Sequence, residues 1–160
     1  MAMVLNDEQR MLRDSARDFL TQRAPISHLR QLRDSGNKAG FSRDLWSEMT
    51  DMGWTAILVP EEYGGLDYGY SGLGLLLEES GRTLTPSPLL GTALTGVAAL
   101  LHAGTPEQRA ELLPAVAAGE RILSLACDEA GGHRPDRVAT RAEPHGNGYR
   151  LTGTKTAVVD

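Results

Sequence analysis

The chain has 160 residues, of which 41% are hydrophobic and 23% charged, values typical of an ordinary folded domain rather than of a disordered or fibrous protein. Its formal net charge of -5 and its scattered basic residues argue against a nucleic-acid partner, because phosphate backbones are bound by clustered lysine and arginine. A single cysteine excludes an intrachain disulfide, and neither a signal peptide nor an apolar run long enough for a membrane span is apparent, so we expect a cytoplasmic protein.

The first predicted helix begins after Asn6, which is spaced to form a capping box with Gln9. Behind this cap, apolar residues recur at helical spacing and charged residues occupy the other side, the pattern of an amphipathic surface helix. The apolar positions are Leu12, Ala16, Phe19 and Leu20. The following residues 25–40 have weak periodicity and predict a loop with one short helix at most.

A second helix is predicted after Ser42, a favourable cap, and Gly53 is placed to end it in the left-handed conformation. Its apolar face consists of Leu45, Trp46, Met49 and Met52. The apolar run 54–59 then resembles a strand, which Pro60 and the glycines after it stop. Residues 71–81, rich in leucine, predict a third helix.

The next predicted element is a buried helix over residues 89–103, which is too short and too rich in small residues to span a membrane. Thr105, Pro106 and Gln108 give the clearest helix start in the sequence: a threonine cap, proline at the first helical position and a capping-box glutamine. We expect Pro114 to kink or restart this helix, because proline lacks an N–H group and its ring disturbs the preceding turn. The next glycine should end it.

Beyond residue 119 the pattern changes from helical to strand-like. Three strand candidates follow, with a hairpin connection between the last two. The candidates are residues 122–126, 138–143 and 149–159, and the connection is residues 144–148. The sequence therefore predicts an α+β fold, with a helical domain over residues 1–119 and the first strands of a β-domain over residues 120–160. Because so few strands leave unpaired sheet edges, we expect the natural protein to continue.

No motif for catalysis or metal binding is apparent. The four histidines lack zinc-site spacing, and no nucleophile elbow or Walker loop occurs. The glycine-rich stretch 69–74 is interpreted as a tight turn rather than an anion site, since the G-x-G-x-x-G spacing is missing. Cys127 is interpreted as a small buried residue, because the sequence places no histidine or lysine to activate its thiol. Motifs alone indicate only an α+β fragment.

Four segments, in this order and at these separations, resemble the acyl-CoA dehydrogenase family. The most distinctive is a Pro-Glu-x-Tyr-Gly-Gly element after a helix, found here within Val59–Gly65. The others are Gly104–Pro114 with Gly119–Glu120, Leu125–Gly132 and Gly148–Lys155. The resemblance covers nearly the whole chain. It implies a helical N-terminal domain followed by the start of a β-barrel-like middle domain.

The resemblance also implies an activity, the flavin-dependent α,β-dehydrogenation of an acyl-CoA thioester, with FAD held between the middle domain and a C-terminal helical domain. In the family a glutamate removes the α-proton while hydride passes to the flavin. That glutamate is expected beyond residue 160, so no catalytic residue is assigned within this chain. An acyl-CoA substrate, an electron-transfer flavoprotein or similar acceptor, and a homo- or hetero-tetramer are further implied.

Single positions of the family pattern can be transferred to this sequence. The flavin-contacting stretches correspond to Ala126, Cys127, Ala157, Val158 and Val159. The positions near acyl-CoA correspond to His133, Tyr63, Gly64 and Gly65. Cys127 and Ala157 stand where the family has a threonine and an aromatic residue, which removes a hydroxyl donor and an aromatic surface of roughly 150–250 Å².

These departures leave alternatives open. In the leading hypothesis the chain is part of an active acyl-CoA dehydrogenase; in the second it is the degenerate, non-catalytic partner in an enzyme built of two unlike chains. The third and least favoured is a helical interaction domain whose resemblance is accidental. For the 160-residue chain alone we expect weak FAD binding, because one wall of a cofactor site does not offset the entropy of immobilising the ligand.

Overall fold

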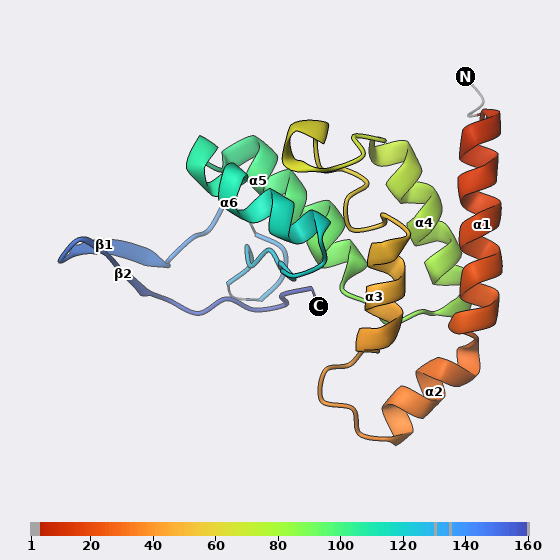
Figure 1. Cartoon of the computed structure of the whole chain (residues 1–160). Coiled ribbons are helices and arrows are strands. Elements are labelled where there is room, and N and C mark those ends of the chain that lie inside the picture. The colour runs from red at the N-terminus through yellow and green to blue at the C-terminus, as the bar shows by residue number, and fades with distance from the viewer. Residues whose placement is uncertain (1–3, 130, 135, 160) are drawn as a thin grey trace.

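The computed structural model describes residues 4–129, 131–134 and 136–159. A body of helices comes first, and a two-stranded hairpin near the end of the chain extends away from it (Figure 1). The helices are α1 (Asp7–Arg23), α2 (Ile26–Asp34), α3 (Arg43–Asp51), η1 (Glu61–Tyr63), α4 (Tyr70–Thr83), η2 (Leu90–Gly96), α5 (Val97–Ala103) and α6 (Pro106–Ala117). The strands are β1 (Arg141–His145) and β2 (Gly148–Thr152). The predicted α+β class is confirmed.

The predicted helix starts are confirmed in atomic detail. The Asn6 side chain accepts a hydrogen bond from the Gln9 N–H at 2.8 Å, and the Gln9 side chain accepts one from the Asn6 N–H at 3.1 Å. Thr105 and Gln108 form the same reciprocal pair at the start of α6. Each box satisfies two of the N–H groups that a helix start leaves unpaired.

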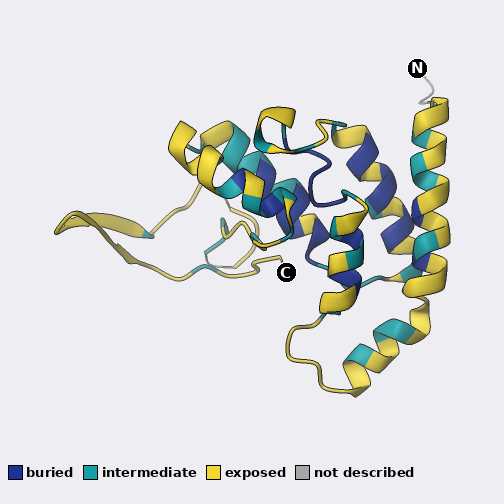
Figure 2. Ribbon diagram, viewed as in Figure 1, coloured by how far each residue is buried: buried dark blue, intermediate teal, exposed yellow. Residues whose placement is uncertain are grey.

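The core lies where α1, α3, α4, η2 and α6 face the segment 54–59 (Figure 2). Trp54 is buried at its centre, and its ring meets Phe19 of α1 edge to face, with ring centroids 5.4 Å apart. The Trp46 indole N–H donates to the Gly119 carbonyl, and the Thr55 hydroxyl donates to the Ala117 carbonyl. These bonds fix the C-terminal end of α6 against the core.

The segment 54–59 is buried but forms a series of turns, so the predicted strand is wrong. Its backbone groups bond locally, as in the Val59 N–H to Ala56 carbonyl bond at 3.1 Å. Three of its carbonyls accept from the N–H groups of residues 66–68. An apolar run signals burial, and here these turns satisfy the buried backbone without a regular ladder.

Several helical predictions need correction. Met52 is 38% exposed, because it lies past the end of α3 and outside the buried face of that helix. Pro114 does not restart α6, because the helix continues through it to Ala117, with Leu113 and Val116 buried on either side of the proline. The predicted kink stays a prediction. The predicted helix 89–103 is continuous, but its first part, η2, is a π-helix, and its last turn is partly exposed.

The strand predictions are only partly confirmed. Residues 122–126 are not a strand: the Thr92 hydroxyl of η2 donates to the Leu123 carbonyl at 3.2 Å and accepts from the Leu123 N–H at 3.1 Å. This side chain satisfies backbone groups that a strand neighbour would otherwise pair. In the hairpin, β1 pairs with β2 from Arg141 opposite Thr152 to His145 opposite Gly148, so the connection is shorter than the predicted 144–148. The predicted strand 138–143 begins before β1, and the predicted strand 149–159 ends well after β2.

Every residue of the two hairpin strands is exposed, and the strands run antiparallel. No helix within the described residues is long and apolar enough to cross a membrane. The cytoplasmic location and the division of the chain at residues 119 and 120 stay predictions.

A buried ion pair joins α1 to α4. The Glu79 carboxylate, on a side chain only 1% exposed, accepts two hydrogen bonds from the Arg17 guanidinium at 2.8 and 3.1 Å, and Arg82 lies 3.3 Å away. We expect Arg17→Met to cost about 2 kcal/mol, because it leaves the buried Glu79 carboxylate without its bidentate partner. Urea unfolding of both proteins measures this cost. Arg23→Met, which breaks an exposed pair with Glu48, is the matched control and should change stability far less.

The same pair predicts a pH dependence. The hydrogen bonds from Arg17 lower the pKa of Glu79 below its usual value of 4.5, against the opposing effect of burial. Because the pKa is lower in the folded state, this contribution is complete above the unfolded pKa and is lost as the pH falls through the folded one. We therefore expect the stability difference between wild type and Arg17→Met to shrink below about pH 4. A constant difference down to pH 3 would contradict this assignment.

Candidate functional site

The two stretches assigned to flavin by resemblance lie together in the structure. The Ser124 hydroxyl donates to the Val159 carbonyl at 2.7 Å, and the Thr156 N–H donates to the Asp128 carbonyl at 2.8 Å. Cys127 is half-buried, which corrects its interpretation as a small buried residue. The other four positions, Ala126, Ala157, Val158 and Val159, are exposed. Small apolar side chains therefore form an uncovered surface on two stretches that are far apart in the sequence.

Glu129 holds these stretches in place. Its carboxylate accepts from the Lys155 ammonium at 2.8 Å and from the Thr140 N–H and hydroxyl at 3.0 and 2.6 Å, with a further bond from the Ala139 N–H. Lys155 first, and then these other donors, lower the pKa of Glu129 to about 2. Lys155 also donates to the Cys127 carbonyl at 3.2 Å. No local spacing connects residues 129 and 155, so this contact could not be predicted from the sequence.

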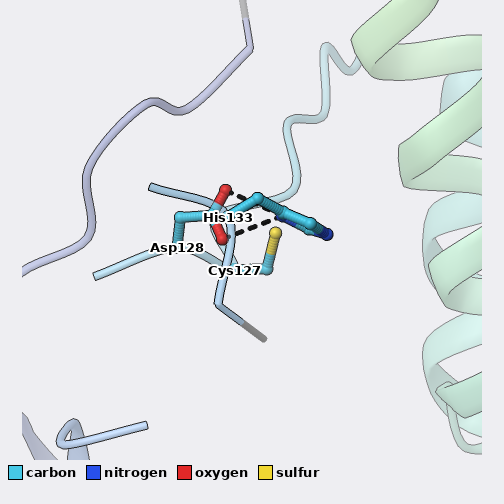
Figure 3. Close-up of side chains that lie close together, drawn as sticks. All are labelled: Cys127, Asp128 and His133. Carbon is cyan, nitrogen blue, oxygen red and sulfur yellow. Dashed lines mark hydrogen bonds and ion pairs between the residues drawn. The ribbon is translucent and has the colours of Figure 1, made fainter. Parts of the chain in front are cut away.

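The His133 imidazole contacts the carboxylate of Asp128. Its Nδ1 is 3.0 Å from Asp128 Oδ1 and 3.2 Å from Oδ2 (Figure 3). One ligand atom each of Cys127, Asp128 and His133 lie within 4.8 Å of one another. The sequence predicted no metal site, because these three residues have neither the paired-cysteine nor the helical histidine spacing of zinc sites.

A largely apolar pocket of about 540 Å³ opens beside these stretches. Four segments line it: residues 39–41, the C-terminal part of α4, residues 84–88 with Leu90, and residues 122–124. Ser124 belongs both to the pocket and to the bond with Val159. The volume lies within the range of roughly 300–1,000 Å³ that is usual for small-molecule sites.

Tyr63, Gly64 and Gly65 are not among the residues that line this pocket. Tyr63 is half-buried at the end of η1 and packs against the core, and Gly64 has a φ of 80°, which favours glycine. Gly65 approaches the Val59 backbone so closely that an added Cβ would lie 1.8 Å from the Val59 carbonyl oxygen. This element thus has a structural role, and its place near acyl-CoA stays a prediction.

The structure is mostly helical, with a small two-stranded antiparallel sheet after the helices. The family model described as "Acyl-CoA dehydrogenase, N-terminal domain" matches residues 6–120. The chain therefore belongs to the acyl-CoA dehydrogenase family, which confirms the resemblance drawn from its motifs.

Individual relatives agree with this assignment. Acyl-CoA dehydrogenase FadE28 of Mycobacterium tuberculosis is 40% identical over 119 residues, which cover 74% of this chain and 34% of that protein. A variant of the Tcur3481-Tcur3483 steroid ACAD is 36% identical with a TM-score of 0.82, over 95% of this chain and 41% of that one. The ChsE4-ChsE5 complex of M. tuberculosis gives 28% identity and a TM-score of 0.84, over 99% and 42%. The chain thus spans well under half the length of these relatives.

Proposed function

We propose that this chain forms part of a FAD-dependent acyl-CoA dehydrogenase, in which it supplies the acyl pocket and one wall of the flavin site. The observation that carries the proposal is the position of Ser124, which lines the apolar pocket and binds the Val159 carbonyl of the flavin-assigned stretch. A pocket beside the cofactor surface is what the reaction needs, since the carbons that lose hydrogen must face the flavin. Family membership supports the cofactor and the substrate class.

The residues present fit a flat cofactor that is held partly through backbone groups. Ala126, Ala157, Val158 and Val159 leave an apolar surface uncovered, and Lys155 and Glu129 fix the backbone on which Cys127 lies. FAD supplies the hydride acceptor when it is bound. The part of the chain described here would orient the thioester, exclude water from its acyl group and hold one side of the flavin. Proton removal is assigned to no residue of this chain.

The proposal has a direct test. The protein in its natural length, purified with any chain that accompanies it, should carry FAD, and anaerobic addition of a suitable acyl-CoA should bleach the flavin absorbance. The substrate panel should include straight-chain, branched, cyclic and steroid-derived thioesters, the last because a similar solved structure is a steroid ACAD. A flavin that stays oxidised across the panel would refute the enzymatic proposal. An electron-transfer flavoprotein as acceptor and an oligomeric assembly belong to the same proposal.

A pocket variant tests the acyl assignment separately. Ile122 lines the pocket and is 41% exposed, so Ile122→Trp should narrow the pocket without creating a void in the core. We expect the KM for acyl-CoA to rise about tenfold or more, while the FAD content is unchanged. Ile26→Trp is the matched control, because Ile26 lies on α2, is 45% exposed and does not line the pocket. Equal KM values for the two variants would show that the acyl group binds elsewhere.

A further inference from the structure

The side chains of Cys127, Asp128 and His133 present three different donor atoms to one point in space: a sulfur, a carboxylate oxygen and an imidazole nitrogen (Figure 3). All three atoms lie within 4.8 Å of one another, and the closest oxygen–nitrogen pair is 3.0 Å apart. The roles that the resemblance implies for Cys127 and His133, contacts to flavin and to acyl-CoA, do not require these three donor atoms to meet.

The backbone explains why these residues meet. Lys155 binds the Cys127 carbonyl and the Thr156 N–H binds the Asp128 carbonyl, so the first two residues of the cluster are fixed. Gly131 and Gly132 have φ values of 66° and 111°, which glycine adopts at little cost. This turn returns the chain so that His133 faces Asp128. The cluster is thus part of a loop that is anchored at one side and closed by glycines at the other.

We propose that Cys127, Asp128 and His133 bind a single Zn²⁺ ion, or a similar divalent transition metal, with a fourth position left for water or another small ligand. Thiolate, imidazole and carboxylate are together the donor set of zinc, whereas Mg²⁺ and Ca²⁺ prefer oxygen donors alone. At zinc bond lengths of about 2.0–2.3 Å, tetrahedral ligand atoms lie roughly 3.3–3.8 Å apart. From the observed cluster, the Asp128–His133 pair at 3.0 Å has to open slightly and the wider spacings, up to 4.8 Å, have to contract. His133 has the freedom to make this adjustment, because its side chain is 73% exposed.

Binding has a definite proton balance. The Cys127 thiol releases its proton to solvent, and His133 coordinates through Nδ1 as a neutral imidazole with its remaining proton on Nε2. The Asp128 carboxylate exchanges its contact with His133 for the metal. Because the ligands must be deprotonated, the affinity should rise with pH. No oxidant or other reactant is needed.

The proposal does not rest on the enzymatic function. Cys127 lies in the flavin-assigned stretch and His133 at a position assigned to acyl-CoA, so bound metal and bound cofactor would compete for this surface. Metal binding in the absence of flavin and flavin reduction in the absence of metal are measured separately, and either can fail alone.

Co²⁺ is the probe of choice, because a cobalt–thiolate bond gives a charge-transfer absorption and Cys127 is the only cysteine of the chain. Titration of the reduced, purified protein should show this absorption saturating at one equivalent, and added Zn²⁺ should abolish it. Cys127→Ser should lose the absorption, and Asp128→Asn and His133→Gln should each weaken binding by about tenfold or more. His145→Gln is the matched control, since His145 is an exposed histidine that contacts Arg150 on the hairpin, and it should bind like wild type.

Two results would overturn the proposal. The first is the absence of thiolate absorption at a saturating Co²⁺ concentration. The second is wild-type affinity in both Asp128→Asn and His133→Gln, which would mean that Cys127 binds metal without the cluster. Far-UV circular dichroism of each variant establishes that the helices are retained, so that neither result can arise from unfolding.

Discussion

Gly65→Ala is expected to destabilise the protein by about 3 kcal/mol or more, the cost of severe overpacking. The added Cβ would lie 1.8 Å from the Val59 carbonyl oxygen and 2.2 Å from its carbonyl carbon, and backbone atoms cannot rotate out of the way as a side chain does. Val59 is itself completely buried, so the displacement would reach the core. The midpoint and slope of urea unfolding measure the loss.

Gly64→Ala provides the control one residue away. Gly64 has a φ of 80° and nothing within 4 Å of an added Cβ, so its substitution should cost only about 1 kcal/mol of backbone strain. If Gly65→Ala proved no more costly than Gly64→Ala, the close approach to Val59 would be wrong. Both glycines belong to the element that resemblance assigns to acyl-CoA. A loss of stability in Gly65→Ala alone would show that this glycine is needed for folding, whether or not the element also binds acyl-CoA.

Trp54→Ala should remove about 3–5 kcal/mol of stability, a large part of the 5–15 kcal/mol that usually holds a domain of this size together. The indole is 1% exposed, meets Phe19 edge to face and fills the centre of the core, so its loss leaves a cavity. Thermal and urea unfolding should both show the effect. In contrast, Tyr149→Ala removes a side chain that is 72% exposed on the hairpin and should change stability little.

Trp54→Phe refines this experiment. Phenylalanine keeps a ring against Phe19 while leaving a smaller void, so its cost should lie between those of Tyr149→Ala and Trp54→Ala. A cost equal to that of Trp54→Ala would indicate that the indole as a whole, rather than its contact with Phe19, determines stability.

Local signals predicted the helical part of this fold well. The caps at Asn6, Ser42 and Thr105 act through residues three positions away, so their chemistry is readable in the sequence. The apolar run 54–59 was harder, because burial alone does not distinguish a strand from a chain of buried turns. Its backbone partners at residues 66–68 are set by the tertiary structure.

The candidate site was predictable only as a set of positions. Resemblance selected residues 126–127 and 157–159, but the contacts that join them, Ser124 with Val159 and Glu129 with Lys155, connect residues 35 and 26 positions apart. The pocket likewise draws its walls from four separate segments. The cluster of Cys127, Asp128 and His133 depends on the turn at Gly131 and Gly132. No helical or paired-cysteine spacing in the sequence indicates such a loop.

The bond between Thr92 and Leu123 limits how the apolar pocket can change shape. One hydroxyl serves as donor and acceptor for both backbone groups of the same residue, so a rotation of η2 would break both hydrogen bonds together. Gly96 of the same helix lies so close that an added Cβ would be 2.6 Å from the Leu123 Cβ, which leaves no room for sliding. Changes in the shape of the pocket must therefore come from residues 39–41 and 84–88, two of its walls that are loops. Exchanging those loops would then change which molecules fit the pocket, while the wall formed by η2 stays in place.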